Sequence, residues 1–266
     1  MKTLISAILT AAIAFGTLCL NGCSVKNENR LVMATNATFP PYEYLDENGE
    51  LVGIDIEIGQ AIAEKLGKEL EIKDLPHFDD VLDSVEDNKY DFGMAALTVN
   101  EERMTRVSFS NTYAKGIQVV IVKSGSEFSS FKEFYSEFDS EGIPVSIKPE
   151  IKIGVQKDTT GDSYSSDTFI NWGFGEENVK RYDSGDDAVK ALLADEVTAV
   201  IIDNEPAKAF VNSYERLKIL DGAYADEDYA VIVSKENNEL LGKINNAIAE
   251  LEKDGTLKKI IDKYIK

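Results

Sequence analysis

The sequence predicts an α/β fold divided into two lobes. With 266 residues, the chain is longer than one average domain of roughly 150 residues and shorter than two. Candidate strands and helices alternate along it, a pattern typical of mainly parallel sheets joined by right-handed crossovers. The alternation runs once through each half of the chain, so we expect two mainly parallel sheets, one in each lobe. Hydrophobic residues make up 43% of the chain, which suits a globular protein with a real core.

The first half of the chain is predicted to contain three strands separated by two helices. The strands are expected at residues 30–36, 70–75 and 90–97, and the helices at residues 55–67 and 79–88. The first helix has the clearest pattern, because Ile58, Ile62 and Leu66 recur at helical spacing. A turn around Asn48-Gly49 should precede it.

The second half repeats this pattern. Its strands are expected at residues 117–125, 151–156, 179–184 and 197–203, and its helices at residues 162–172 and 186–196. A strand at 229–236 and two helices, 238–255 and 256–266, end the chain. If those helices pack on the first lobe, the chain crosses between the lobes twice, which makes a hinge beside a cleft for a small ligand. The predicted lobes are residues 31–114 with 226–266, and residues 115–225.

Residues 126–150 interrupt the second half with a charged segment that contains several aromatic residues. We expect this insertion to be a helix-and-loop decoration that covers the second lobe. A docking surface for a partner is the alternative.

The first 22 residues have the order of a secretory signal peptide. Lys2 is followed by a mostly apolar run from Leu4 to Leu20 and then by small residues. A single transmembrane anchor is the alternative, but about 20 apolar residues are needed to span a bilayer. Because serine, threonine and glycine interrupt this run, we expect a signal peptide at residues 1–22.

The segment Leu20-Asn21-Gly22-Cys23 resembles a bacterial lipobox. The resemblance implies cleavage before Cys23, lipid attachment to that residue, and an extracytoplasmic protein anchored at the cell membrane. The other of the two cysteines, Cys19, lies in the predicted signal peptide. The exported chain would therefore keep one cysteine and have no disulfide to form. An incidental cysteine near a signal peptide is the alternative. Residues 23–30 are predicted to be a polar linker between the anchor and the domain.

The charge and the residue content argue against several classes of function. Lys and Arg number 28 against 48 Asp and Glu, a net charge of −20, so the protein repels nucleic acid. The single histidine, His77, provides no histidine cluster for a metal. We predict no cofactor and no metal site. An anchored hydrolase with two catalytic carboxylates is the enzyme alternative.

Three segments carry a resemblance to a known family: residues 34–67, residues 90–113 and residues 153–164. They resemble the family 3 solute-binding proteins of polar amino-acid ABC importers, and the likeness extends over residues 31–266. The resemblance implies a periplasmic-binding-protein-like fold of type II with two lobes. It also implies a monomer that captures an amino acid in the cleft and delivers it to a membrane permease without chemistry. A dehydratase on the same fold is the enzyme alternative.

By this resemblance, Arg103 binds the α-carboxylate of the ligand. A guanidinium suits a carboxylate because its planar fork makes two parallel, charge-assisted hydrogen bonds. Asn100 is typical of a helix N-cap, which would place Arg103 in the first turn of a short helix. Thr98, at the end of a strand, should donate its hydroxyl and amide to the same carboxylate. A surface ion pair between Arg103 and a neighbouring glutamate is the alternative.

The second lobe is expected to supply the remaining polar contacts. Thr159 and Thr160 match the family's turn before a helix, where backbone N–H groups attract an anion. Asp158 stands where the family commonly has glycine, which leaves the local backbone shape open. Asp203 matches the carboxylate that receives the α-ammonium group, and a helix cap is its alternative role.

Phe39 and Phe78 match two aromatic positions that flank the side chain of the ligand. Asn36 stands where several binders of basic amino acids have an acid, so we expect a neutral polar ligand. A basic amino acid is the alternative, because Glu43 or Asp79 could reach the pocket instead.

Overall fold

A computed structural model describes residues 29–265 of the chain as an α/β fold. The strands of its main sheet are β1 (Arg30–Thr35), β5 (Glu69–Asp74), β6 (Phe92–Gly93), β7 (Val107–Lys123), β10 (Ile153–Gln156), β11 (Val179–Tyr182), β12 (Ala199–Asp203), β13 (Leu217–Ile219) and β14 (Ala225–Ser234). Within the described residues they form one sheet in the order β11-β10-β12-β7-β14-β6-β1-β5, with β13 beside β7.

Helices cover this sheet, and short strands outside it form two small sheets. The helices are α1 (Ile54–Lys65), α2 (Phe78–Glu86), α3 (Glu101–Arg106), α4 (Thr160–Ser166), α5 (Gly185–Leu193), α6 (Asn204–Ser213), α7 (Asn238–Lys253) and α8 (Thr256–Tyr264). Short 3-10 helices are η1 (Phe131–Phe134), η2 (Phe169–Asn171) and η3 (Glu176–Asn178). One small sheet contains β2 (Thr38–Phe39), β3 (Glu43–Leu45) and β4 (Leu51–Val52). Another contains β8 (Tyr135–Phe138) and β9 (Pro144–Ile147).

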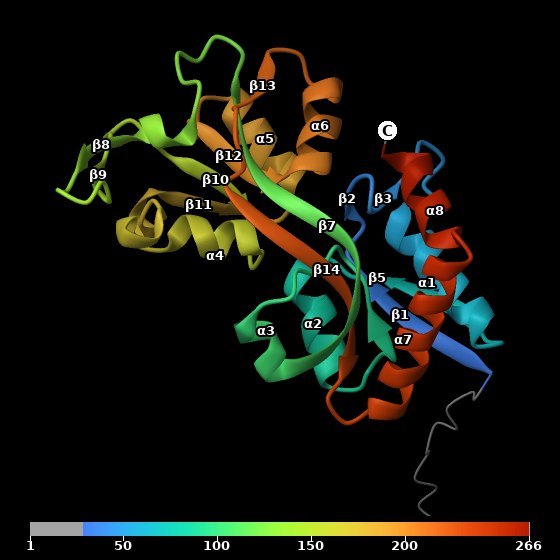
Figure 1. Cartoon of the computed structure of the whole chain (residues 1–266). Helices are drawn as coiled ribbons and strands as arrows, with labels where there is room; N and C mark the ends of the chain where they lie inside the picture. Colours follow the sequence, from blue (N-terminus) through green and yellow to red (C-terminus); the bar gives the residue numbers. More distant parts are fainter. Residues whose placement is uncertain (1–28, 266) are drawn as a thin grey trace, which may run out of the picture.

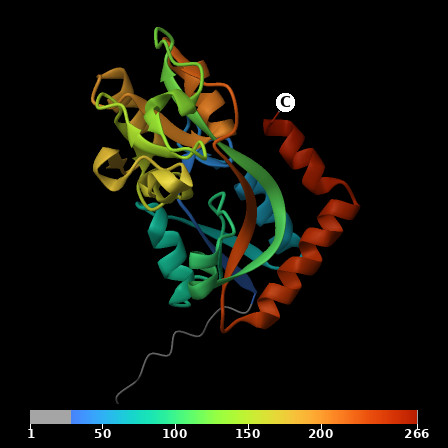
Figure 2. The same ribbon diagram turned by 60° about the vertical axis from the view of Figure 1, so that its left-hand side comes forward.

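The main sheet is mixed. At one end β1 is parallel to β5 and β6, and at the other end β10 is parallel to β11 and β12. Between them β7 and β14 pair with each other, and with β12 and β6, in antiparallel orientation. We call β1, β5 and β6 with the helices around them the first group of elements, and β10, β11 and β12 with the helices around them the second group. Figures 1 and 2 show β7 and β14 running side by side between these two groups.

This sheet differs from the two mainly parallel sheets that the sequence predicts. β7 is 17 residues long, and its ladder with β14 extends from the pair Val107 and Ser234 to the pair Gln118 and Ala225. Because that ladder bridges the two parallel groups, their strands belong to one sheet. The prediction of two separate sheets is therefore wrong, although each end of the sheet is parallel as expected.

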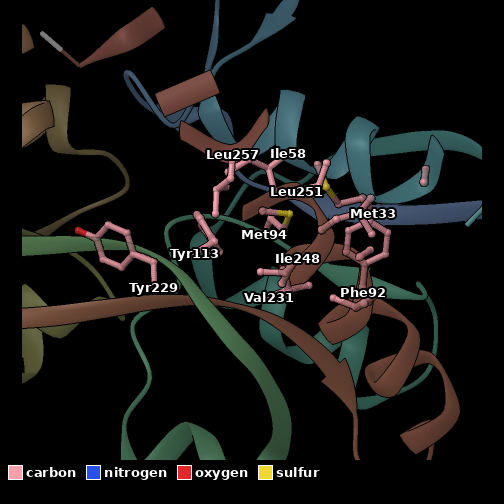
Figure 3. Packing of buried hydrophobic residues seen from close by; sticks show 14 of the residues in the cluster. Met33, Ile58, Phe92, Met94, Tyr113, Tyr229, Val231, Ile248, Leu251 and Leu257 are labelled. Atoms are coloured by element: carbon pink, nitrogen blue, oxygen red, sulfur yellow. The ribbon is translucent and has the colours of Figure 1, made fainter. Parts of the chain in front are cut away.

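Buried apolar side chains gather separately at the two ends of the sheet. Near β1, residues from 31–113 and 229–260 share a cluster, part of which is shown in Figure 3. Near β10, buried residues from 119–220 make up the clusters. Ile248 and Leu251 of α7 and Leu257 and Ile260 of α8 belong to the cluster near β1, so both helices pack on the first group of elements.

Most predicted elements are confirmed to within a few residues, and the differences have local causes. β6 spans two residues instead of eight, because the chain leaves the sheet there and Ala96 has a φ of 45°. The insertion at 126–150 forms η1 and a hairpin of β8 and β9, and its Phe131 and Phe134 are buried in a core cluster. The insertion therefore covers the second group of elements. The helix predicted at residues 162–172 ends at Ser166, in α4, and the 3-10 helix η2 follows it. The short strands β2, β8, β9 and β13 were not predicted.

Within residues 29–265, no helix is both long enough and apolar enough to span a membrane. The predicted signal peptide at 1–22, together with Cys19 and Cys23, lies outside the described residues.

Candidate functional site

A cavity with about 440 Å³ of empty space, its opening to solvent included, lies between the two groups of elements. All eight residues that the sequence singles out for the ligand line it: Asn36, Phe39, Phe78, Thr98, Arg103, Thr159, Thr160 and Asp203. The first five come from residues 36–103 and the last three from residues 159–203. The cavity is therefore bounded by side chains from both ends of the main sheet.

Arg103 lies on one wall of the cavity. It belongs to α3, whose first turn is capped by Asn100, since the Asn100 side chain accepts a hydrogen bond of 2.8 Å from the Arg103 amide. Arg103 is only 7% exposed, and its guanidinium donates to the backbone carbonyls of Thr98 (3.2 Å) and Asp158 (3.3 Å). Burial lowers the pKa of Arg103, and the Glu227 carboxylate opposes that shift. The alternative of a surface ion pair is wrong.

Threonine hydroxyls from the two groups of elements meet beside Arg103. The Oγ1 atoms of Thr98 and Thr160 are 3.4 Å apart, and both side chains are buried. Thr159 caps α4, because its Oγ1 accepts a hydrogen bond from the Asp162 amide. These hydroxyls and the arginine together surround one end of the cavity.

Asp158 adopts a backbone conformation that suits the glycine commonly found at this position of the turn. Its φ is 64°, a left-handed conformation that favours glycine but that aspartate tolerates better than most residues. Its carboxylate lies 3.2 Å from Lys157 Nζ, while its carbonyl accepts from Arg103. The glycine-like backbone shape is thus kept, and the acid has a lysine partner.

Asp203 lines the cavity at the end of β12. It precedes α6 but its side chain makes no capping hydrogen bond, so the alternative of a helix cap is wrong. Its Oδ2 instead accepts from Gln118 Nε2 at 2.9 Å, and its Oδ1 accepts from the Tyr229 hydroxyl. Figure 3 shows this hydroxyl pointing away from the core cluster. Burial, followed by the charge of Glu227, raises the pKa of Asp203 well above its usual value.

Amide side chains occupy another part of the cavity wall. Asn36 donates to the Leu75 carbonyl (2.8 Å) and accepts from Thr38 Oγ1 (2.8 Å). Gln156 Nε2, from the second group of elements, lies 3.3 Å from both Asn36 Oδ1 and Thr38 Oγ1. This part of the cavity is polar and carries no formal charge on these side chains.

The two phenylalanines line the cavity in different ways. Phe39 packs 6.2 Å from the Tyr42 ring and contacts core clusters of both groups of elements. Phe78 stacks on the Arg103 guanidinium, with the Arg103 Cζ atom 5.1 Å from its ring centroid. A cation over an aromatic face is an attractive contact, so Phe78 also fixes the position of Arg103.

Several functional candidates were not found from the sequence. Gln118 and Gln156 line the cavity, and Glu227 and Tyr229 surround Asp203. For the two glutamines a signal exists, because each is a polar residue in an otherwise apolar strand run. Glu43, considered as an alternative acid, does line the cavity and is buried. Burial, followed by the charge of Asp55, raises the pKa of Glu43 well above its usual value.

The arrangement suits binding of a small molecule with charges of both signs. The guanidinium of Arg103 and the hydroxyls of Thr98 and Thr160 suit an anionic group, and the carboxyl group of Asp203 suits a cationic group. Among residues 29–265, no group of three or more histidine, cysteine or carboxylate side chains is placed to hold a metal ion.

Comparisons with known proteins agree with this geometry. Residues 31–266 match the family described as bacterial extracellular solute-binding proteins, family 3. The chain is 27% identical to the arginine-binding extracellular protein ArtP of Bacillus subtilis, over 99% of this chain and 98% of that protein. It is 26% identical to the L-cystine-binding protein TcyJ of Escherichia coli, over 90% of this chain and 84% of that protein.

Solved structures give the same result. The fold resembles an ancestral arginine-binding protein bound to arginine, with a TM-score of 0.78 and 35% identity, over 90% of this chain and 99% of that chain. An ancestral arginine-binding protein bound to glutamine gives a TM-score of 0.77 and 34% identity, over 89% and 98% of the two chains. This chain belongs to the family 3 bacterial extracellular solute-binding proteins.

Proposed function

We propose that the protein captures a free amino acid in the cavity and delivers it to the permease of an ABC importer. The supporting observation is that a buried guanidinium and a buried carboxyl group line the same cavity. Arg103 donates to carbonyls, Asp203 accepts from neutral donors, and both line one cavity. The relatives compared above are named as binding proteins, so the hydrolase and dehydratase alternatives are set aside.

In this proposal, the α-carboxylate of the ligand binds Arg103 and the hydroxyls of Thr98 and Thr160, with Thr159 at the same turn. The α-ammonium group binds Asp203. Four charged hydrogen bonds contribute about 8 kcal/mol at roughly 2 kcal/mol each, whereas association costs about 4 to 15 kcal/mol. Contacts with the aromatic residues and closure of the cavity must therefore supply the rest of the affinity.

Closure is proposed to move two lobes, residues 31–114 with 226–266 and residues 115–225, about a hinge in β7 and β14. Both boundaries of the second lobe fall at these two strands. Across the cavity, Thr98 contacts Thr160, Arg103 contacts Asp158, and Asn36 contacts Gln156. These contacts support a closed form that separates ligand from water.

The preferred ligand is proposed to be a neutral polar amino acid. The side chains of Asn36 and Gln156 are amides, which can both donate and accept hydrogen bonds but do not neutralise a cationic ligand. Of the two solved structures described above, each of an ancestral arginine-binding protein, one is bound to glutamine and the other to arginine. A basic amino acid remains the alternative.

A thermal-shift screen of the twenty amino acids and cystine tests this function. A ligand at about 100 times its dissociation constant stabilises the folded protein by roughly 2.7 kcal/mol, which raises the melting temperature by about 5 to 10 °C in a protein of this size. We expect the largest rise with a neutral polar amino acid. A larger rise with arginine or lysine would reject the neutral preference, and no rise with any amino acid would reject the function.

The protein is further proposed to be held at the outer side of the cell membrane by a lipid on Cys23. A Cys23→Ser variant should move from the membrane fraction to the soluble extracytoplasmic fraction, because the acceptor sulfur is lost. Cys19→Ser is the matched control and should leave the distribution unchanged, since Cys19 lies upstream of the cleavage point. Retention of the Cys23→Ser variant in the membrane contradicts the anchor.

A further inference from the structure

A second buried carboxylate, that of Glu227 in β14, lies beside Asp203. One amide group joins the two acids, because Gln118 Nε2 donates to Asp203 Oδ2 and to Glu227 Oε2, each at 2.9 Å. Asp203 is 7% exposed and Glu227 is 4% exposed. Glu227 also aligns opposite Gly116 of β7, in the central ladder of the sheet. Its position is therefore fixed by backbone pairing and not by a mobile loop.

The groups around this pair do not neutralise two negative charges. Tyr229 of β14 donates to Asp203, and burial raises the pKa of its hydroxyl. The hydroxyls of Tyr42 and of Tyr164 in α4 also have raised pKa values, chiefly through burial, with Asp203 and Glu227 respectively adding to the shift.

Among acidic groups, Glu227 raises the pKa of Arg103 in α3 the most, but the guanidinium hydrogen bonds of Arg103 go to carbonyls. Glu43 of β3 and Glu205 of α6 add further acidic groups near Tyr42. Within the described residues, Glu227 Oε1 has no hydrogen-bond partner. Two buried carboxylates that share one amide donor repel each other when both are ionised, which favours a proton on Asp203 while no cation is bound.

We infer that Glu227 is a second carboxylate of the ammonium-binding site, that Asp203 is protonated beside it in the ligand-free protein, and that the ammonium group of the ligand replaces this proton. The inference rests on the proposed function, because it assumes a ligand with an ammonium group.

The exchange conserves charge inside the protein. Before binding, two carboxylates and one proton carry a net charge of −1. On binding, the proton passes to the solvent and the ammonium group brings one positive charge, so the net charge at the site is again −1. A ligand without a cationic amine cannot take the place of the proton, and the pair thereby discriminates against such ligands.

Binding that releases a proton must strengthen as the pH rises. While the pair is protonated in the free protein and ionised in the complex, each pH unit raises the affinity by up to about tenfold. Once the free protein has also lost the proton, the affinity no longer depends on pH through this pair. The sign is opposite for a site that takes up a proton with its ligand.

Calorimetry in two buffers measures the released proton directly. Titrations with L-glutamine in phosphate and in Tris at the same pH differ in apparent enthalpy by the number of protons released times the difference in buffer ionisation enthalpy. If L-glutamine does not bind, the same titration is made with L-arginine. We expect close to one proton for the native protein, and a value near zero for Glu227→Gln, which removes one carboxylate but keeps the shape.

Glu205→Gln is the matched control. Glu205 lies two residues after Asp203 and pairs with Lys208 Nζ at 2.6 Å, so its loss should leave proton release unchanged. Binding without proton release in the native protein overturns the inference, and so does undiminished release in Glu227→Gln. If Glu227→Gln does not fold, an affinity of the native protein that stays flat between pH 5 and 8 overturns it. Failure of both amino acids to bind instead counts against the proposed function.

Discussion

Replacing Arg103 with alanine is expected to reduce the affinity for an amino acid by roughly 100-fold to several thousand-fold. The guanidinium is buried and hydrogen-bonded to two carbonyls at the cavity wall. Without it, the ligand's carboxylate would be enclosed without a counter-charge, which costs about 3 to 5 kcal/mol. Isothermal titration calorimetry with the amino acid identified in the screen measures the loss.

Arg106→Ala is the control on the same helix. Arg106 forms ion pairs with Asp79, Asp83 and Glu86 and does not line the cavity. Because partly exposed ion pairs contribute about 0 to 1 kcal/mol each, its loss should lower stability modestly and leave the affinity within about twofold. If Arg103→Ala bound as tightly as the native protein, the proposed position of the ligand would be wrong.

The local fold could be predicted well because most elements carry their own periodic signal. The apolar spacing of Ile58 and Ile62 places α1, and the spacing of Ile244 and Ile248 places α7. The single main sheet could not be predicted in this way. The first half of β7 contains Ser108, Asn111 and other polar residues, so it lacks a strand-like apolar run, although its backbone continues the ladder with β14.

Sequence motifs predicted many residues that line the cavity, but they did not predict the residues around Asp203. Gln118 and Glu227 are separated by 109 positions, and only the register of β7 against β14 brings them together. One overlooked signal is Gly116. A Cβ atom there would lie 2.8 Å from Asp203 Oδ1, so the missing side chain leaves space for the Tyr229 hydroxyl to reach that carboxylate. A glycine inside a strand commonly marks such a close approach.

Replacing Asp203 with asparagine should separate the two ends of the proposed ligand. The charged hydrogen bond to the ammonium group is lost, which weakens an amino acid by about 2 to 3 kcal/mol, or roughly 30-fold to 150-fold. The variant can keep its fold, because the asparagine oxygen can accept from Gln118 Nε2 and the new NH₂ group can donate to the Tyr229 hydroxyl oxygen. Circular dichroism verifies that the fold is kept.

The decisive measurement for Asp203→Asn is the ratio of the affinities for two ligands. Calorimetry compares the amino acid with its deaminated analogue, which keeps the α-carboxylate but has no ammonium group. Only the amino acid should lose affinity, because the analogue makes no ionic contact with Asp203 in the native protein. Asp228→Asn is the matched control, since Asp228 is exposed in β14 and its nearest cation, Lys115 Nζ, is 3.8 Å away. Equal weakening of both ligands by Asp203→Asn would mean that Asp203 shapes the cavity without binding the amine.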